Sequence, residues 1–255
     1  MRNMITPDDL RGIAGRERIG LGIIERDHAI TVALMILSKT HFSDALIFKG
    51  GTAIKKMFYP EARFSEDLDF NSQRDVARQL AREVRRPLLA YDEGARFTGV
   101  TVEDIRGEHA RRLRLQYRDM NGYLTSIKLD LTFLEKTAMK TKRIKVKNMY
   151  DMKNIMIATM DIREIMAEKV RALIHTGRPR HLYDIWFLLG KHVKPTRTLI
   201  NRKLSIYNQT FDADSLLRVT KETERDWETD LRALLPEVPR FSVVQSRVTK
   251  AFSKL

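Results

Sequence analysis

The chain of 255 residues contains no cysteine, which excludes disulfide bonds and zinc sites built from thiolates. It also lacks an apolar run long enough to span a membrane, and its first residues, MRNMITPDDLRG, lack the apolar core of a signal peptide. Internal repeats and low-complexity segments are absent as well. We therefore expect a globular protein of a reducing compartment, the cytoplasm.

Several well-known nucleotide and metal motifs are also missing. No glycine-rich stretch has the spacing and the Gly-Lys-Ser/Thr ending of a P-loop, and neither the Rossmann nor the protein-kinase glycine pattern occurs. The six histidines are scattered and no two stand four residues apart, so a zinc hydrolase on a helix is not expected. Any nucleotide chemistry must therefore rest on other residues.

Charge is what the chain has in excess. It carries 47 Lys and Arg residues against 33 Asp and Glu residues, a formal net charge of +14. Such a surplus favours a polyanionic partner, namely RNA, DNA, a nucleotide or an acidic protein. A solvated basic surface without a partner is the alternative, because charge by itself names no ligand.

The most informative stretch is LIFKGGTAIKKMFYPEARFSEDLDF, residues 46–70. It opens with an apolar run typical of a buried strand, continues with Gly50, Gly51 and Thr52, and then with a short helical segment. The glycines allow the backbone to approach phosphate oxygens, and Thr52 offers a hydroxyl at a helix N-terminus. The stretch ends with Asp67 and Asp69 alternating with apolar residues.

Alternation in a strand places residues two apart on the same face. Asp67 and Asp69 are therefore predicted to share one face while Leu68 and Phe70 enter the core. Asp130 stands in a similar alternating segment, SIKLDLTF. If the two strands are neighbours, the three acids Asp67, Asp69 and Asp130 converge and can hold two Mg²⁺ ions, with Asp130 also able to accept a proton. A polar strand edge is the bland alternative for these acids.

The rest of the chain predicts an α+β fold. The N-terminal part, residues 1–150, is expected to hold a mixed β-sheet of about five strands with helices on one side, and residues 151–255 an all-helical C-terminal domain. Strands are expected at residues 46–48, 67–70, 97–103, 113–118 and 124–134. Helices are expected at residues 27–39, 75–90, 162–174, 181–190, 196–206, 215–235 and 243–252.

Two polar residues interrupt apolar helical patterns in the second half. Lys169 falls within the apolar stripe of IREIMAEKVRALI, and Asp184 is the lone charge in HLYDIWFLL. A buried ammonium needs an anion unless it extends to solvent. A phosphate or carboxylate in a cleft between the two halves would supply it. Asp184 either orients Lys169 or a substrate group, or serves only to start its helix.

The motifs FKGGTAIKK, RFSEDLDF, KLDLTF, AEKVRAL and RHLYDIWFLL, in that order over residues 20–255, resemble the AbiEii/MenT family of nucleotidyltransferase toxins within the polymerase β-like superfamily. The resemblance implies an N-terminal nucleotidyltransferase domain, a helical C-terminal domain and Mg²⁺-dependent transfer of a nucleotide from an NTP. It also implies a cognate antitoxin protein encoded nearby.

Carried over by position, the resemblance assigns the site residues. The nucleotide-binding set is Lys49, Gly50, Gly51, Thr52 and Lys169; the metal ligands are Asp67, Asp69 and Asp130; the catalytic set is these three acids with Lys169 and Asp184. One position departs from the family, where the last motif usually reads Arg-Asp-Leu-Tyr-Asp. Here His181 replaces the first Asp, and a function that depends on that acid would be altered.

The leading hypothesis is an Mg²⁺-dependent nucleotidyltransferase that acts on an RNA acceptor of the tRNA kind, as the toxin of a type IV toxin–antitoxin or abortive-infection system. The same chemistry on a protein or small-molecule hydroxyl is a second hypothesis. A non-catalytic basic module that binds RNA or a partner on a degenerate transferase fold is a third. Toxicity rests on the resemblance alone, since a housekeeping enzyme would carry the same motifs.

Overall fold

The computed structural model describes residues 5–105, 109–133 and 136–255. The chain divides into two compact units. The first comprises Met1–Lys136 and Thr141–Met160, and the second comprises Thr137–Lys140 and Asp161–Leu255. The first unit is built around a sheet, and every regular element described in the second is a helix.

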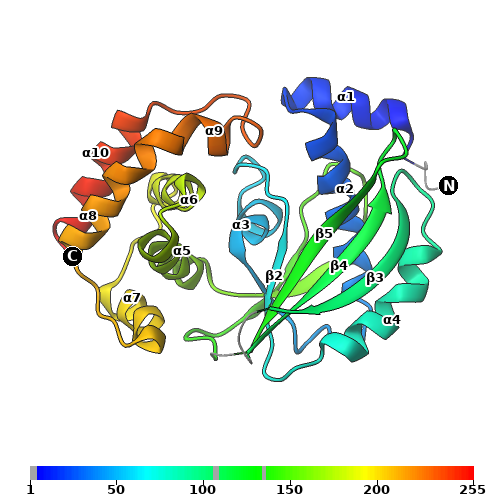
Figure 1. The fold of residues 1–255 in the computed structure, drawn as a ribbon, viewed down its shortest axis with the longest axis horizontal. Coiled ribbons are helices and arrows are strands. Elements are labelled where there is room, and N and C mark those ends of the chain that lie inside the picture. The colour runs from blue at the N-terminus through cyan, green and yellow to red at the C-terminus, as the bar shows by residue number, and fades with distance from the viewer. Residues whose placement is uncertain (1–4, 106–108, 134–135) are drawn as a thin grey trace. The chain divides into compact units, whose positions relative to one another are not determined.

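A mixed sheet of seven strands forms the first unit, in the order β3-β4-β5-β2-β1-β7-β6 (Figure 1). Strands β2 and β5 run parallel, as do β1 and β7, and the other neighbours are antiparallel. The strands are β1 (Ile47–Lys49), β2 (Leu68–Asn71), β3 (Arg96–Asp104), β4 (Ala110–Arg118), β5 (Leu124–Thr132), β6 (Lys142–Lys145) and β7 (Met156–Thr159).

The sheet confirms the predicted α+β class and has two strands more than the five expected. The additional strands, β6 and β7, are only four residues long. They lack the long alternation by which a strand is recognised in sequence, and they are formed by pairing with each other and with β1. Leu134, the expected end of the strand that begins at Leu124, lies outside the described residues.

Two helices, α2 (Leu21–Leu37) and α4 (Ala77–Leu89), pack on the long strands β3, β4 and β5. Helix α1 (Pro7–Glu17) packs on α2, and α3 (Gly50–Ala53), which a π-helix (Ile54–Phe58) follows, contacts β1 and β2. Helix α2 is apolar almost all round and is buried from Ala29 to Leu37, as a central helix must be. Helix α4 contacts β3, β4 and α2, and lies along the outer strands in Figure 1.

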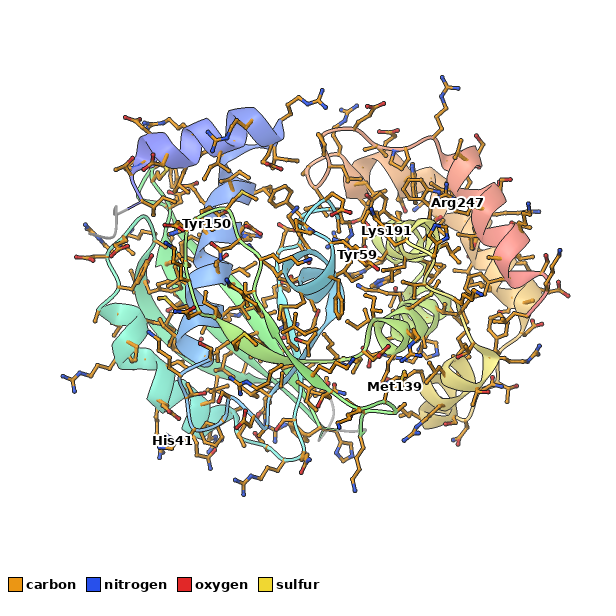
Figure 2. All side chains as sticks on the ribbon, turned by 180° about the vertical axis from the view of Figure 1, so that it is seen from behind. His41, Tyr59, Met139, Tyr150, Lys191 and Arg247 are labelled. Atoms are coloured by element: carbon orange, nitrogen blue, oxygen red, sulfur yellow. The ribbon has the colours of Figure 1, made fainter. Side chains whose placement is uncertain are left out.

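The second unit is an assembly of short helices. They are α5 (Ile162–Thr176), α6 (Pro179–Gly190), α7 (Arg197–Leu204), a 3₁₀ turn (Ser205–Tyr207), α8 (Ala213–Glu222), a second 3₁₀ turn (Thr223–Asp226), α9 (Trp227–Leu231) and α10 (Phe241–Phe252). Arg247 of α10, labelled in Figure 2, stacks on the ring of Trp186 of α6, with 5.0 Å from the guanidinium carbon to the ring centroid.

The single helix expected over residues 215–235 is wrong in detail. It is broken into α8, a 3₁₀ turn and α9. The hydroxyl of Thr223 donates to the carbonyl oxygen of Thr220 at 2.7 Å, and such side-chain bonds compete with the regular helical ladder. The tighter turn is followed by Trp227, which is 2% exposed.

In the part of the chain that the structure describes, no helix is long and apolar enough to cross a membrane.

Candidate active site

Two of the predicted acids stand side by side on adjacent strands. Asp69 of β2 is the register partner of Asp130 in the parallel strand β5, and on its other side it pairs with Lys49 of β1. Both carboxylates are half-buried, whereas Leu68 and Phe70, the neighbours of Asp69 in β2, are buried. The sequence required the strands of Asp69 and Asp130 to be neighbours, and in the sheet they are.

Gly50 is required by the position of the Asp69 carboxylate. Its φ of +79° is in the left-handed region, and a Cβ built on it would lie 2.1 Å from Oδ2 of Asp69 and 2.9 Å from its Cγ. No side chain at position 50 can coexist with the acid in this place. The glycine therefore has a role in seating the acid, beside the phosphate contact expected from sequence.

Gly51 lies against two polar residues that the sequence reading missed. A Cβ on Gly51 would lie 2.9 Å from Nη2 of Arg63 and 3.0 Å from Oγ of Ser65. Arg63, Ser65, Asp67 and Asp69 occur at every second position of RFSEDLDF. The alternation that singled out the two acids could therefore have indicated the arginine and the serine as well.

Thr52 links the two ends of the segment that runs from the glycine turn to Asp67. Its hydroxyl donates to the carbonyl oxygen of Asp67 at 2.5 Å, and the residue is 2% exposed. Lys55 also holds this segment, since its Nζ donates to the carbonyl oxygens of Pro60 at 2.6 Å and Ala62 at 2.9 Å. Burial lowers the pKa of Lys55 to about 8. Both side chains thus fix the backbone that carries Asp67.

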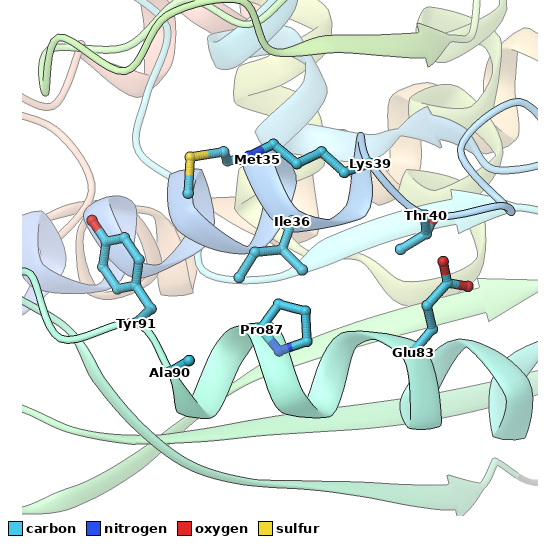
Figure 3. A pocket seen from close by; sticks show the side chains of 8 residues that line it. All are labelled: Met35, Ile36, Lys39, Thr40, Glu83, Pro87, Ala90 and Tyr91. Carbon is cyan, nitrogen blue, oxygen red and sulfur yellow. The ribbon is translucent and has the colours of Figure 1, made fainter.

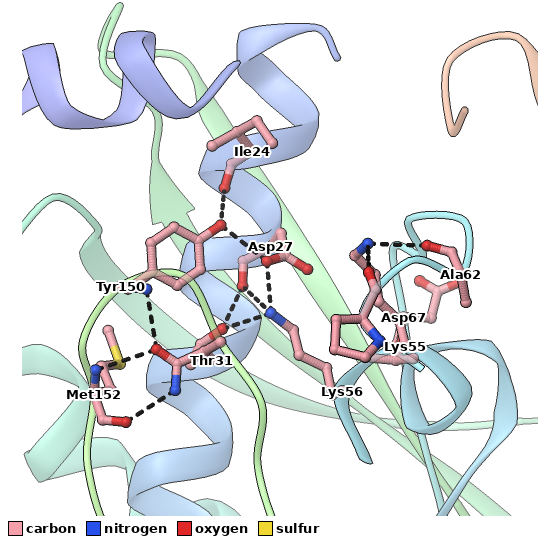
Figure 4. A network of polar contacts seen from close by, with 12 residues as sticks. Ile24, Asp27, Thr31, Lys55, Lys56, Ala62, Asp67, Tyr150 and Met152 are labelled. Atoms are coloured by element: carbon pink, nitrogen blue, oxygen red, sulfur yellow. Dashed lines mark hydrogen bonds and ion pairs between the residues drawn. The ribbon is translucent and has the colours of Figure 1, made fainter. Parts of the chain in front are cut away.

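Lys56 anchors the glycine turn to α2. Its Nζ lies 2.5 Å from Oδ2 of Asp27 and 2.9 Å from the hydroxyl of Thr31 (Figure 4). The phenol of Tyr150 donates to the same Asp27 oxygen at 2.8 Å and to the carbonyl oxygen of Ile24 at 3.1 Å. Burial lowers the pKa of Lys56 and Asp27 opposes that shift. The pair is inaccessible to substrate, so its role is structural.

Arg112 of β4 holds Asp130. It is the cross-strand partner of Asp130, and its Nε and Nη2 lie 2.7 and 2.8 Å from the two carboxylate oxygens. This two-point contact with Asp130 raises the pKa of Arg112. The geometry fixes the orientation of the acid and uses both of its oxygens.

Among the charged groups that act on Asp67, Lys128 has the largest effect on its pKa. It precedes Asp130 by two residues on β5 and so shares its face of the sheet. Burial raises the pKa of Asp67; Lys128 opposes the rise, and Asp130 adds to it. The side chain of Lys128 makes no hydrogen bond or ion pair with another described residue. Its ammonium is available to a phosphate, a role that the sequence reading did not assign.

A stability test follows from the raised pKa of Asp67. The folded protein binds this proton more readily than the unfolded chain, so the ionised carboxylate opposes folding above the ordinary pKa of 3.8. We expect Asp67→Asn to raise the free energy of unfolding at pH 7. The gain should shrink as the pH falls through the raised pKa and disappear well below the ordinary one.

Urea unfolding at a series of pH values measures this effect. Asp92→Asn is the matched control, because Asp92 is an exposed acid of the same unit and should show no gain. A lower free energy of unfolding for Asp67→Asn at pH 7 would contradict the assigned environment of this acid.

The fit of a divalent metal to these acids is partial. Among the described residues, no group of three or more acidic or histidine side chains is arranged to hold a metal ion. Arg112 engages both oxygens of Asp130, so this acid is already held by a cation. Two carboxylates suit Mg²⁺ when substrate phosphates and water complete its shell. The metal site therefore stays a prediction, for three acids and for Asp67 and Asp69 alone.

In the helical unit, Lys169 and Asp184 form an ion pair. Nζ of Lys169 on α5 lies 2.8 Å from Oδ2 of Asp184 on α6, and the residues are 7% and 2% exposed. His181 stands three residues before Asp184 on the same helix. The buried ammonium thus has the anion that it requires, and Asp184 holds Lys169 rather than capping α6, whose N-cap is Arg178.

A second buried cluster lies on α5 of the same unit. Lys203 Nζ is 2.7 Å from Glu164 and 3.2 Å from Glu168, and Glu164 also accepts from the backbone N–H groups of Ala138 and Met139. These groups satisfy one another, so we assign the cluster to holding residues 137–140 on α5 rather than to chemistry.

Comparison with known proteins identifies the family and the fold of this chain. The profile of a family described as nucleotidyl transferase AbiEii toxin, type IV TA system, matches residues 32–253. Among solved structures, the fold is similar to that of MenT4, a nucleotidyltransferase toxin from Mycobacterium tuberculosis. The TM-score is 0.75 at 20% sequence identity, over 98% of this chain and 89% of that one. No curated protein matches in sequence.

Proposed function

Because the chain belongs to the AbiEii family of nucleotidyl transferase toxins of type IV toxin–antitoxin systems, we propose that it transfers a nucleotide from an NTP to an RNA acceptor, with tRNA as the first candidate. Membership implies an antitoxin partner and a nucleotide substrate. The observation that carries the proposal is the seating of Asp69 against Gly50, beside Asp130 on the next strand.

The chain's own residues divide the work. Asp67 and Asp69 would hold Mg²⁺ together with the phosphates, and the bound metal supplies Lewis-acid polarisation of those phosphates. The backbone at Gly50 and Gly51 leaves room for phosphate oxygens, and Arg63 and Ser65 flank it. Lys128 supplies positive charge next to Asp67 as pyrophosphate departs.

Asp130 is the proposed proton acceptor for the attacking hydroxyl. The two contacts from Arg112 fix the orientation of its carboxylate on the sheet. In the helical unit, Lys169 remains the proposed phosphate ligand, with Asp184 holding its ammonium in place. Magnesium, acceptor identity and cytoplasmic location are parts of this proposal.

The test is to incubate the protein with Mg²⁺, each labelled NTP in turn, and total RNA. We expect label on RNA with one or more NTPs, and a loss of at least about a thousandfold for Asp69→Asn, as for removal of a catalytic group. Asp92→Asn, an exposed acid of the same unit, is the matched control and should keep full transfer.

Other outcomes identify the alternatives. Label on protein or on a small molecule would replace RNA as the acceptor class. No Mg²⁺-dependent NTP binding by calorimetry, combined with salt-sensitive RNA binding, would make the protein a non-catalytic module. Transfer that persists unchanged in Asp69→Asn would overturn the assignment of the site.

A further inference from the structure

Helix α4 carries a stripe of four arginines, Arg78, Arg82, Arg85 and Arg86, which we call the α4 stripe. All four are exposed, and at about 100° per residue they lie within an arc of about 100°. None makes a hydrogen bond or an ion pair with another described residue through its side chain. Glu83, the acid of this helix, is bound instead to His41 at 2.9 Å.

Several arginines elsewhere in the same unit are paired with acids. Arg26 contacts Glu66, Arg112 contacts Asp130, and Arg114 contacts Glu103. Like charges three and four residues apart on a helix repel one another, which costs the folded state free energy. The α4 stripe therefore contributes nothing to the fold that would account for it, and its charges are open to an external polyanion.

An apolar pocket adjoins the stripe between α2 and α4 (Figure 3). Its volume is about 250 Å³, and its walls are mainly Met35, Ile36, Pro87 and Tyr91, with Lys39 at its edge. Lys39 is exposed and makes no side-chain hydrogen bond or ion pair with another described residue. Proteins hold an unstacked base in this kind of environment, where an aromatic side chain stacks on the flat base and cations stand beside it.

We propose that this face is the docking surface for the folded RNA acceptor, with the phosphate backbone on the α4 stripe and one unpaired base in the α2–α4 pocket. The proposal rests on RNA being the acceptor. RNA is favoured over an acidic protein because four unpaired guanidinium groups stand in one arc of the helix, and their planar, two-point donors match phosphate oxygens along a nucleic-acid backbone.

The surface lies on the opposite face of the sheet from the acids. Leu113, Leu115 and Leu129 are buried on the face that α2 and α4 cover, and Arg112 and Asp130 alternate with them on the other face. From α4, RNA would pass round the edge strand β3 to reach β2. This path crosses the three strand spacings between β3 and β2 and the thickness of one layer, which together amount to about 25 Å. About seven stacked nucleotides, at ~3.4 Å each, span that length. A short oligonucleotide cannot occupy both places.

The experiment compares the full-length protein with a variant in which all four stripe arginines are Gln. The control replaces four exposed cations of the helical unit, Arg218, Lys221, Arg232 and Lys250, by Gln and makes the same change in net charge. Binding of labelled bulk tRNA is measured by anisotropy across a salt series. We expect the stripe variant to lose tRNA affinity by roughly tenfold to a hundredfold. The slope of the logarithm of the binding constant against the logarithm of the salt concentration should be smaller in magnitude by about three.

Pocket filling is tested separately. Ala90 is exposed at the rim, so Ala90→Phe can fill the pocket without disturbing the core. We expect a loss of about tenfold in tRNA affinity with an unchanged salt slope, and no change for blunt duplex RNA, which has no free base. Wild-type tRNA affinity in this variant would overturn the pocket assignment.

Transfer assays separate this inference from the proposed function. At saturating tRNA the stripe variant should keep the wild-type kcat and show a raised KM. If the wild type transfers label to RNA but the stripe variant binds tRNA as the control does, the docking surface is wrong and the function stands. If the wild type transfers no label, the function fails, whatever the binding data show.

Discussion

Gly50→Ala is expected to lose at least about a hundredfold in nucleotide transfer. The new Cβ would lie 2.1 Å from Oδ2 of Asp69, so the carboxylate or the turn must move by an amount on the order of 1 Å. A displacement of that size at a reacting centre costs about a hundredfold in rate. Single-turnover transfer at saturating NTP measures it.

Gly122→Ala is the matched control. Gly122 has a φ of +84°, close to that of Gly50, but a Cβ there would meet nothing within 4 Å. Both substitutions carry the strain of a left-handed alanine, about 1–2 kcal/mol, which urea unfolding will show. Only Gly50→Ala should lose transfer. Equal activity in the two variants would mean that the seat of Asp69 does not matter to catalysis.

Lys56→Met is expected to have the largest effect on stability. Lys56 and Asp27 are each 2% exposed in their side chains, and they are 2.5 Å apart. Removing the ammonium leaves the carboxylate of Asp27 buried without its counter-charge, which costs about 3–5 kcal/mol. Urea unfolding followed by circular dichroism gives the difference in the free energy of unfolding.

The double variant Asp27→Asn/Lys56→Met separates charge from packing. It removes the unpaired charge and retains an acceptor for the Tyr150 phenol, which donates to Asp27 in the wild type. We expect it to be more stable than Lys56→Met alone, so that the double-mutant cycle shows a coupling between the two positions. A double variant as unstable as the sum of the single ones would indicate that the pair is not a charge interaction.

The sequence predicted the acids of the sheet through local signals. Asp67, Asp69 and Asp130 alternate with apolar residues, and Leu68, Phe70 and Leu129 are buried in the fold. A period of two follows from strand geometry, so it can be read from a short segment. The glycine turn was found from another local signal, the residue types Gly50, Gly51 and Thr52. Strand and helix periodicity along the chain likewise indicated the α+β fold that the structure confirms.

The partners of the site could not be read in this way. Lys55 and Lys56, three and four residues after Thr52, are buried, and they are bound to backbone carbonyls and to Asp27 respectively. Arg112 is bound to Asp130. Each of these choices depends on which segment packs against which, and hydrophobic periodicity carries no such information. The two four-residue strands β6 and β7 stood outside the five expected strands for a related reason, since pairing forms them.

By itself, then, the sequence indicated the family through the resemblance of its motifs. It determined the fold class and the places of the acids and glycines because strand and turn geometry are local properties of the chain. Only the tertiary structure decided that Gly50 seats Asp69, that Lys128 is an available cation near Asp67, and that the α4 stripe is unpaired. These features depend on contacts between distant segments. The free energy of such contacts comes from burial and charge pairing, which exist only once the chain has folded.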